Sequence, residues 1–162
     1  MQATRSGFLI ERRFRAPPDM VFRLWTEPAY VTLWWGIEGA TIPYCELDVR
    51  PGGRWRIDMR APGGTVYRNE GEYLDVVPCE LLVFSDIPDP SIEEYEGDVP
   101  QLRRHEVTFT GIGEETQVRM AVTFGNEAER ERHFAFGMPR GMEQSLDRLD
   151  ALIASLRLRP PS

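Results

Sequence analysis

The stretch Met138–Leu158, MPRGMEQSLDRLDALIASLRL, is the longest helical pattern in this 162-residue chain. Its apolar residues recur three or four positions apart, which predicts one apolar face along a helix. They are Met138, Met142, Leu146, Leu149, Leu152, Ile153 and Leu156. The opposite face is charged, and Pro160 and Pro161 end the pattern. A helix of this length extends roughly 30 Å, enough to cross a small domain.

Strand-like segments occupy most of the chain before this helix. They fall at 8–15, 44–49, 53–60, 65–77, 81–86, 102–110 and 116–123. Two short helices follow the first strand, each with a proline near its start, Pro18 and Pro28. A lone long amphipathic helix beside many strands must bury its apolar face against the sheet.

This order predicts an α+β fold of the helix-grip type. A curved antiparallel sheet wraps around the long C-terminal helix, and the two short helices close one end. A charged helical segment at 127–136 comes before the long helix, and Gly137 and Pro139 separate the two. We expect a single domain over residues 1–162.

Composition excludes several classes of protein. The net charge is −7, with 26 acidic residues against 19 lysines and arginines, which argues against a nucleic-acid surface. No apolar run approaches the roughly 18 residues that a membrane span requires. No apolar segment of a signal peptide follows Arg12 and Arg13, so we expect a cytoplasmic protein. We favour two reduced thiols, Cys45 and Cys79, over a disulfide between them.

Motifs for metals, nucleotides and covalent catalysis are missing from the sequence. The two histidines and two cysteines do not have the spacing of a zinc site, and no phosphate-binding loop or nucleophile elbow occurs. We therefore expect no metal and no cofactor.

The two histidines lie in different patterns. His105 alternates with Val107 and Phe109, which predicts a place on the concave face as a hydrogen-bond donor or general base. The alternative is a partly exposed histidine at the end of a strand. His133 lies among charged residues, which indicates a solvated helical face.

Aromatic residues mark the concave face of the predicted sheet. Trp55, Ile57 and Met59 alternate with charged residues and point inward, either as core or as cavity lining. Tyr67, Asn69 and Tyr73 place polar tips on the same face if the register holds past Gly71, a predicted bulge or close approach.

Trp34 and Trp35 precede Gly36 at the end of the second short helix. For Trp34 we favour a packing role between the short helices and the sheet. For Trp35, packing and a place at the cavity entrance are equally consistent with the pattern.

Charged side chains are expected on the outer surface. The stripe of Arg54, Arg56 and Arg60 predicts a solvated outer face of the sheet. The Pro- and acid-rich segment 87–101 predicts a long surface loop, and its acidic run 93–96 is interpreted as solvated rather than as a cation site.

Four stretches together resemble one protein family. They are FLIERRFRAPPDMVFRLWTEPAYVTLWWG (8–36), DVRPGGRWRIDMR (48–60), GEYLDVVPCELLVFSD (71–86) and GMEQSLDRLDALIA (141–154). In this order they resemble the homologues of the activator of the heat-shock protein 90 ATPase, the AHSA-type branch of the START-like (SRPBCC) superfamily. The resemblance implies a helix-grip fold with a cavity between sheet and helix, but no single activity.

Members of that superfamily bind lipids, sterols or polyketides, and some are cyclases or hydroxylase subunits. One departure concerns the residue after the glycine that opens the long helix. The family often has tryptophan there, whereas Met142 follows Gly141 here. Because methionine fills irregular space, this departure predicts a cavity of different shape.

We therefore predict a binding protein rather than an enzyme, with a small hydrophobic or amphipathic molecule held between helix and sheet. The predicted walls are Trp35, Trp55, Ile57, Tyr67, Tyr73, His105, Phe109, Met138, Met142 and Leu146. Two alternatives remain open: a cyclase- or dehydratase-like enzyme that uses His105, and a module that stimulates a chaperone ATPase. The last is expected least, because one short domain lacks the extra N-terminal domain of a full co-chaperone. The sequence also leaves open a homodimer.

Overall fold

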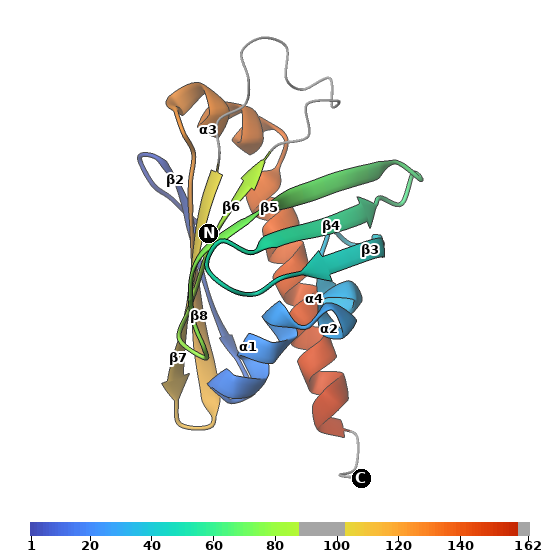
Figure 1. Ribbon diagram of the computed structural model, residues 1–162, viewed down its shortest axis with the longest axis vertical. Helices are drawn as coiled ribbons and strands as arrows, with labels where there is room; N and C mark the ends of the chain where they lie inside the picture. The colour runs from blue at the N-terminus through green and yellow to red at the C-terminus, as the bar shows by residue number, and fades with distance from the viewer. Residues whose placement is uncertain (88–102, 159–162) are drawn as a thin grey trace.

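The computed structural model describes residues 1–87 and 103–158, and its strands form one antiparallel sheet (Figure 1). The strands are β1 (Gln2–Ala3), β2 (Gly7–Phe14), β3 (Thr41–Leu47), β4 (Arg54–Arg60), β5 (Val66–Val77), β6 (Leu81–Ile87), β7 (Arg103–Ile112) and β8 (Glu115–Thr123). They lie in the order β1-β2-β8-β7-β6-β5-β4-β3. The first long strand therefore pairs with the last, and β3 forms the opposite edge.

Four helices are present in the described residues. They are α1 (Pro18–Thr26), α2 (Pro28–Trp34), α3 (Glu127–Ala135) and α4 (Met138–Leu158). Prolines begin α1 and α2, where a missing backbone N–H has no cost. Asn126 caps α3 by accepting a hydrogen bond from the backbone N–H of Glu129 at 2.8 Å. Gly137, at φ 79°, makes the turn into α4.

The long helix α4 lies along the concave side of the sheet, with α1 and α2 near one end and α3 at the other (Figure 1). It packs on β2, α2 and α3. Its buried side chains Leu146, Leu149 and Ile153 come from the apolar face that the sequence predicts. The helix-grip fold is thus confirmed, and α4 has the predicted bounds.

Hydrogen bonds from α4 fix the segment that joins α2 to β3. The Arg148 guanidinium donates to the carbonyls of Trp35, Gly36, Ile37 and Ala40, at 3.0 to 3.3 Å. Ser145 adds a hydrogen bond from its hydroxyl to the Gly36 carbonyl at 2.8 Å. This segment is therefore held against the middle of the helix.

A few elements differ from expectation. The short strand β1 has no clear signal in the sequence, because two residues are too few for a period. The predicted loop over 87–101 lies outside the described residues except for Ile87, which ends β6. The acidic run at 93–96 also lies outside them.

Candidate functional site

A pocket of about 430 Å³ lies between α4 and the sheet. Its lining is mostly apolar and aromatic, and it includes Trp25 and Trp34 from the short helices and Trp35, which follows α2. This size falls in the usual range of small-molecule sites. The strands β3, β4 and β5 bend toward the side on which α4 lies (Figure 1), and residues of all three strands line the pocket.

The residues that line the pocket divide by solvent exposure into a partly exposed rim and a buried floor. Phe136 is 60% exposed, and Tyr67, Met59, Met138 and Met142 are half-buried, so the rim lies between β4–β5 and the start of α4. The floor is formed by lining residues that are buried. They are Trp25, Val31, Trp34, Trp55, Ile57, Tyr73, Leu82, Asp86, Arg103, His105, Met120, His133 and Leu146.

The wall made by the sheet depends on Trp55 and Gly71, which are cross-strand partners in β4 and β5. A Cβ on Gly71 would lie 1.8 Å from the Ser85 carbonyl oxygen and 2.8 Å from Trp55 Nε1. Because that space is empty, the indole lies against the strand and its Nε1–H donates to the Ser85 carbonyl at 3.1 Å. The close approach predicted at Gly71 is confirmed.

A polar cluster occupies one part of the otherwise apolar floor. Asp86 and Arg103 are cross-strand partners in β6 and β7 and form a two-point ion pair. Arg103 Nε donates to Asp86 Oδ1 at 3.0 Å, and Nη2 lies 2.7 Å from Oδ2. Nη1 of Arg103 lies 3.1 Å from both ring nitrogens of His133, which comes from α3. Two strands and one helix therefore meet at this cluster.

The charges of the cluster determine the protonation of Asp86. Burial alone would raise the pKa of this carboxyl group, but the nearby His105 and Arg103 outweigh it and lower the pKa to about 2. The carboxylate is therefore ionised at neutral pH.

His105 lies in the wall beside this carboxylate and is 3% exposed. Its ring stacks on Phe84, with centroids 4.6 Å apart and planes at 8°. Nε2 lies 3.2 Å from Asp86 Oδ1, within the distance of an ion pair when the ring is protonated. The concave-face interpretation of His105 is confirmed, and the alternative of a partly exposed histidine is wrong.

The prediction of a solvated His133 is also wrong, since this residue is 4% exposed. Its ring stacks on Phe124 with centroids 5.2 Å apart. Burial, and then the Arg103 charge, lower the pKa of His133 to about 4. Charged neighbours along α3 define its solvated face, whereas His133 lies on the face turned to the sheet.

The structure brings nine of the ten predicted wall residues around the pocket: Trp35, Trp55, Ile57, Tyr67, Tyr73, His105, Met138, Met142 and Leu146. Phe109 is not among the lining residues. Its ring instead packs edge-on against Phe22 and Trp25 of α1, at 5.4 and 6.1 Å. The helix α1 therefore covers β7 at Phe109 and leaves His105, four residues earlier, on the pocket.

Sequence reasoning missed Asp86, Arg103 and His133 as parts of the site. Asp86 and Arg103 flank the long segment that joins β6 to β7, so pairing these strands in register could have placed them together. Trp34 packs the two short helices together, since its Nε1–H donates to the Leu24 carbonyl of α1 at 2.8 Å, and it also lines the pocket.

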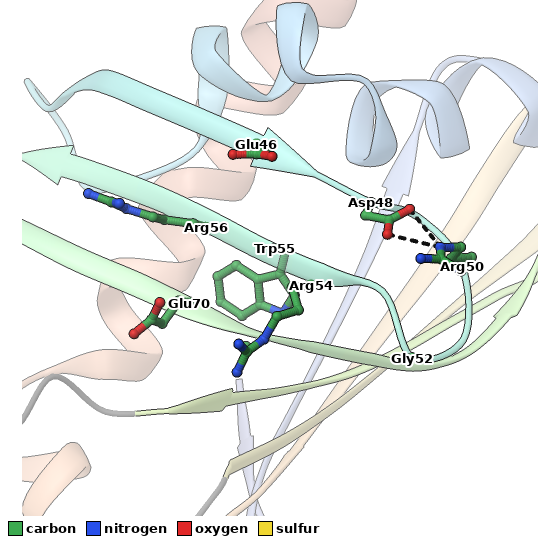
Figure 2. Close-up of a pocket in the computed structure, with 9 residues that line it drawn as sticks. Glu46, Asp48, Arg50, Gly52, Arg54, Trp55, Arg56 and Glu70 are labelled. Atoms are coloured by element: carbon green, nitrogen blue, oxygen red, sulfur yellow. Dashed lines mark hydrogen bonds and ion pairs between the residues drawn. The ribbon is translucent and has the colours of Figure 1, made fainter.

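The outer face of the sheet carries a second hollow, of about 380 Å³ (Figure 2). Its charged side chains come from β3, β4, β5 and the β3–β4 turn, and they pair with their neighbours. Arg50 Nε contacts Asp48 Oδ2 at 2.9 Å, and Arg56 Nη2 contacts Asp58 Oδ2 at 2.8 Å. Arg54 and Arg60 are exposed, as predicted, and Arg56 is partly buried. These local pairs describe a solvated surface rather than a ligand site.

The described residues were predicted to hold no metal site and two reduced thiols. Over 1–87 and 103–158, no three His, Cys, Asp or Glu side chains converge in a way that could hold a metal ion. Cys45 and Cys79 are free cysteines, and burial raises the pKa of the Cys45 thiol to about 11. None of the helices in these ranges is both long and apolar enough to cross a membrane.

These features define a START-like helix-grip domain with a pocket between its long helix and its sheet. The family model for Activator of Hsp90 ATPase homolog 1-like protein matches residues 15–154. The chain therefore belongs to this family.

Solved structures share the fold at low sequence identity. A protein from Nitrosomonas europaea is 21% identical with a TM-score of 0.81, over 95% of this chain and 97% of that one. A protein from Rhodobacter sphaeroides is 21% identical with a TM-score of 0.82, over 96% and 97%. The AHSA1 protein from Silicibacter pomeroyi is 23% identical with a TM-score of 0.72, over 91% and 96%. No curated protein matches this chain in sequence.

Proposed function

We propose that this chain binds a small hydrophobic or amphipathic molecule in the pocket between α4 and the sheet. The observation that carries the proposal is the pocket itself, which has a volume of about 430 Å³ and lies between the long helix and the sheet. Large apolar side chains surround it, so transfer of an apolar molecule from water would drive binding. The polar cluster of Asp86, Arg103 and His133, with His105 beside it, would orient the molecule.

Two measurements test this proposal. Native mass spectrometry of freshly purified protein reports a molecule that copurifies with the chain. Titration with N-phenyl-1-naphthylamine, an uncharged apolar dye that fluoresces when it leaves water, reports binding at an apolar site. We expect saturable binding of one dye molecule per chain.

A matched pair of tryptophan substitutions assigns the binding to this pocket. Met142→Trp places a larger side chain at the rim and is expected to weaken dye binding by at least about tenfold, because it removes space in the pocket. Leu33→Trp is the control, since Leu33 is 55% exposed on α2 and does not line the pocket. Equal dye binding by wild type and Met142→Trp, or no binding at all, contradicts the proposal.

A second candidate function is acid–base chemistry on the bound molecule. The observation that favours it is the Asp86 carboxylate 3.2 Å from Nε2 of His105, a pairing that can orient an imidazole. Under this alternative, a molecule bound by the wild-type chain is converted, and the same molecule bound by His105→Ala is recovered unchanged. Mass spectrometry of the extracted molecule after incubation separates the two cases.

Stimulation of a chaperone ATPase stays a prediction from the family alone. An assay of the ATPase rate of a matched chaperone, with and without this chain, tests it. An unchanged rate contradicts it.

A further inference from the structure

Two side chains in the pocket floor each have a buried nitrogen atom without a hydrogen-bond partner among the described residues. Within these residues, Nδ1 of His105 has no hydrogen-bond partner, and neither has Nε1 of Trp25, a residue that is 8% exposed, whereas Nε2 of His105 lies 3.2 Å from the Asp86 carboxylate. Buried polar groups in proteins nearly always have a partner. Because both residues line the pocket, a bound molecule can supply the missing partners.

The position of His105 is fixed before any molecule binds. Its ring is stacked on Phe84 and enclosed in the pocket wall. An imidazole offers a donor, an acceptor or two donors according to where its protons lie. A hydroxyl group both donates and accepts, so it matches this ring in each of those states.

The charges around His105 disfavour a charged group at this position. An anionic group at His105 would lie beside the carboxylate of Asp86, 3.2 Å from Nε2, while the Arg103 guanidinium is already paired with both oxygens of that carboxylate. A cationic group would need a carboxylate of its own. Both oxygens of Asp86 are already engaged by Arg103.

Trp25 also favours an uncharged molecule. Its indole N–H is a donor only, so its missing partner is an acceptor such as an oxygen atom. The ring lies against Trp34, with centroids 4.9 Å apart, in the most aromatic part of the floor. This surrounding is suited to an uncharged molecule with an apolar body.

Building on the proposed binding function, we propose that the molecule held in this pocket is an uncharged apolar alcohol or phenol, whose hydroxyl group hydrogen-bonds to His105.

A series of naphthalene derivatives tests this class with the unmodified chain. 2-Naphthol, naphthalene and 2-naphthoate share one apolar body and differ in a hydroxyl group, a hydrogen atom and a carboxylate. Each competes with N-phenyl-1-naphthylamine at pH 7.5. We expect 2-naphthol to bind about fivefold to tenfold more tightly than naphthalene, which is the effect of one net hydrogen bond. We expect 2-naphthoate to bind more weakly than 2-naphthol.

The variant His105→Phe assigns the preference to one side chain. Phenylalanine keeps a ring that can stack on Phe84 but removes both nitrogens. The variant is expected to bind naphthalene as the wild type does and to lose the preference for 2-naphthol. Retained naphthalene affinity also shows that the pocket is intact. If the variant does not fold, the wild-type series decides on its own.

The outcomes separate this inference from the proposed function. If all three compounds bind but 2-naphthol has no advantage over naphthalene, or 2-naphthoate binds most tightly, the alcohol or phenol class is overturned and the binding function stands. A preference for 2-naphthol that persists in His105→Phe overturns the role of His105. If neither the dye nor any compound binds, both proposals fall.

Discussion

Asp86 and Arg103 face each other across β6 and β7 and form a two-point ion pair in the floor of an apolar pocket. Both side chains are buried, and the ion pair between them offsets part of the cost of burying each charge. The pair also places a carboxylate beside His105. These two residues therefore affect both the stability of the fold and the polar groups of the pocket.

Replacement of Asp86 by asparagine is expected to lower the free energy of unfolding by roughly 3 kcal/mol at pH 7, because it removes the carboxylate that forms a two-point ion pair with the buried Arg103 guanidinium. Urea unfolding followed by circular dichroism measures this loss. The control is Asp48→Asn, which removes the exposed ion pair with Arg50 and should change stability little. A loss in Asp86→Asn no larger than in the control contradicts the prediction.

The same carboxyl group predicts a dependence of stability on acid pH. Because the folded chain lowers the pKa of Asp86 from 3.8 to about 2, its contribution is complete above about pH 4. It is lost as the pH falls through 2, by roughly 2 kcal/mol. Unfolding free energies of wild type and Asp86→Asn between pH 5 and pH 2 should therefore converge. Parallel curves over this range contradict the assignment.

The lowered pKa of His133 predicts a second pH range, above that of Asp86, over which the stability of the fold changes. Its folded pKa of about 4 lies below the ordinary 6.5, so the unfolded chain binds the proton first as the pH falls. Stability is complete above pH 6.5 and decreases toward pH 4, by about 2 kcal/mol once solvent screening is allowed for. The groups that face this ring are Arg103, Arg132, Glu129 and, through Arg103, Asp86.

Nuclear magnetic resonance of the histidine side chains measures this pKa directly, and the chain has only two histidines. The variant His133→Phe, which keeps a ring against Phe124, should lose the pH dependence between 6.5 and 4. A His133 resonance that titrates near pH 6.5 in the folded protein contradicts the prediction.

Arg148 is expected to hold the part of the pocket wall that the segment between α2 and β3 forms. Arg148→Met removes four donated hydrogen bonds to the segment between α2 and β3, with an expected loss of roughly 2 kcal/mol of stability. Hydrogen exchange of the amides at 36–40 should speed up more than that of the sheet, since the segment loses its anchor. Arg157→Met, which removes one exposed bond to the Arg15 carbonyl, is the control. Equal exchange in both variants contradicts this role.

Gly71 is expected to tolerate no side chain. In Gly71→Ala the added Cβ would lie 1.8 Å from the Ser85 carbonyl oxygen, which is backbone and cannot move aside without shifting β6. The expected loss is about 2 to 3 kcal/mol of unfolding free energy. Gly63→Ala is the matched control, because a Cβ there meets no atom within 4 Å. A Gly71→Ala variant as stable as Gly63→Ala contradicts the role of this close approach.

Local patterns were sufficient for most of the fold. The apolar stripe of 138–158 predicts α4 to the residue, since Gly137 and the prolines after it are local signals. Alternation in 53–60 placed Trp55 and Ile57 on the concave face, because a strand has only two faces. His105 was placed on that face by the same argument.

Local patterns did not predict the contacts between segments that are far apart in the sequence. Phe109 shares the face of His105, yet α1 covers one and not the other. His133 has charged neighbours in sequence but is buried against Phe124. The pairing of Asp86 with Arg103 depends on the register of β6 and β7 across a long intervening segment.

Residues within one or two turns of each other were enough to predict the order of the longer strands and the helices, and the apolar faces of α4 and β4. Packing between distant segments set the shape of the pocket and brought a carboxylate, a guanidinium and two imidazoles together at its floor. These features depend on strand register and on the curvature of β3–β5, which follow from packing across the whole domain. No single stretch of the chain encodes them.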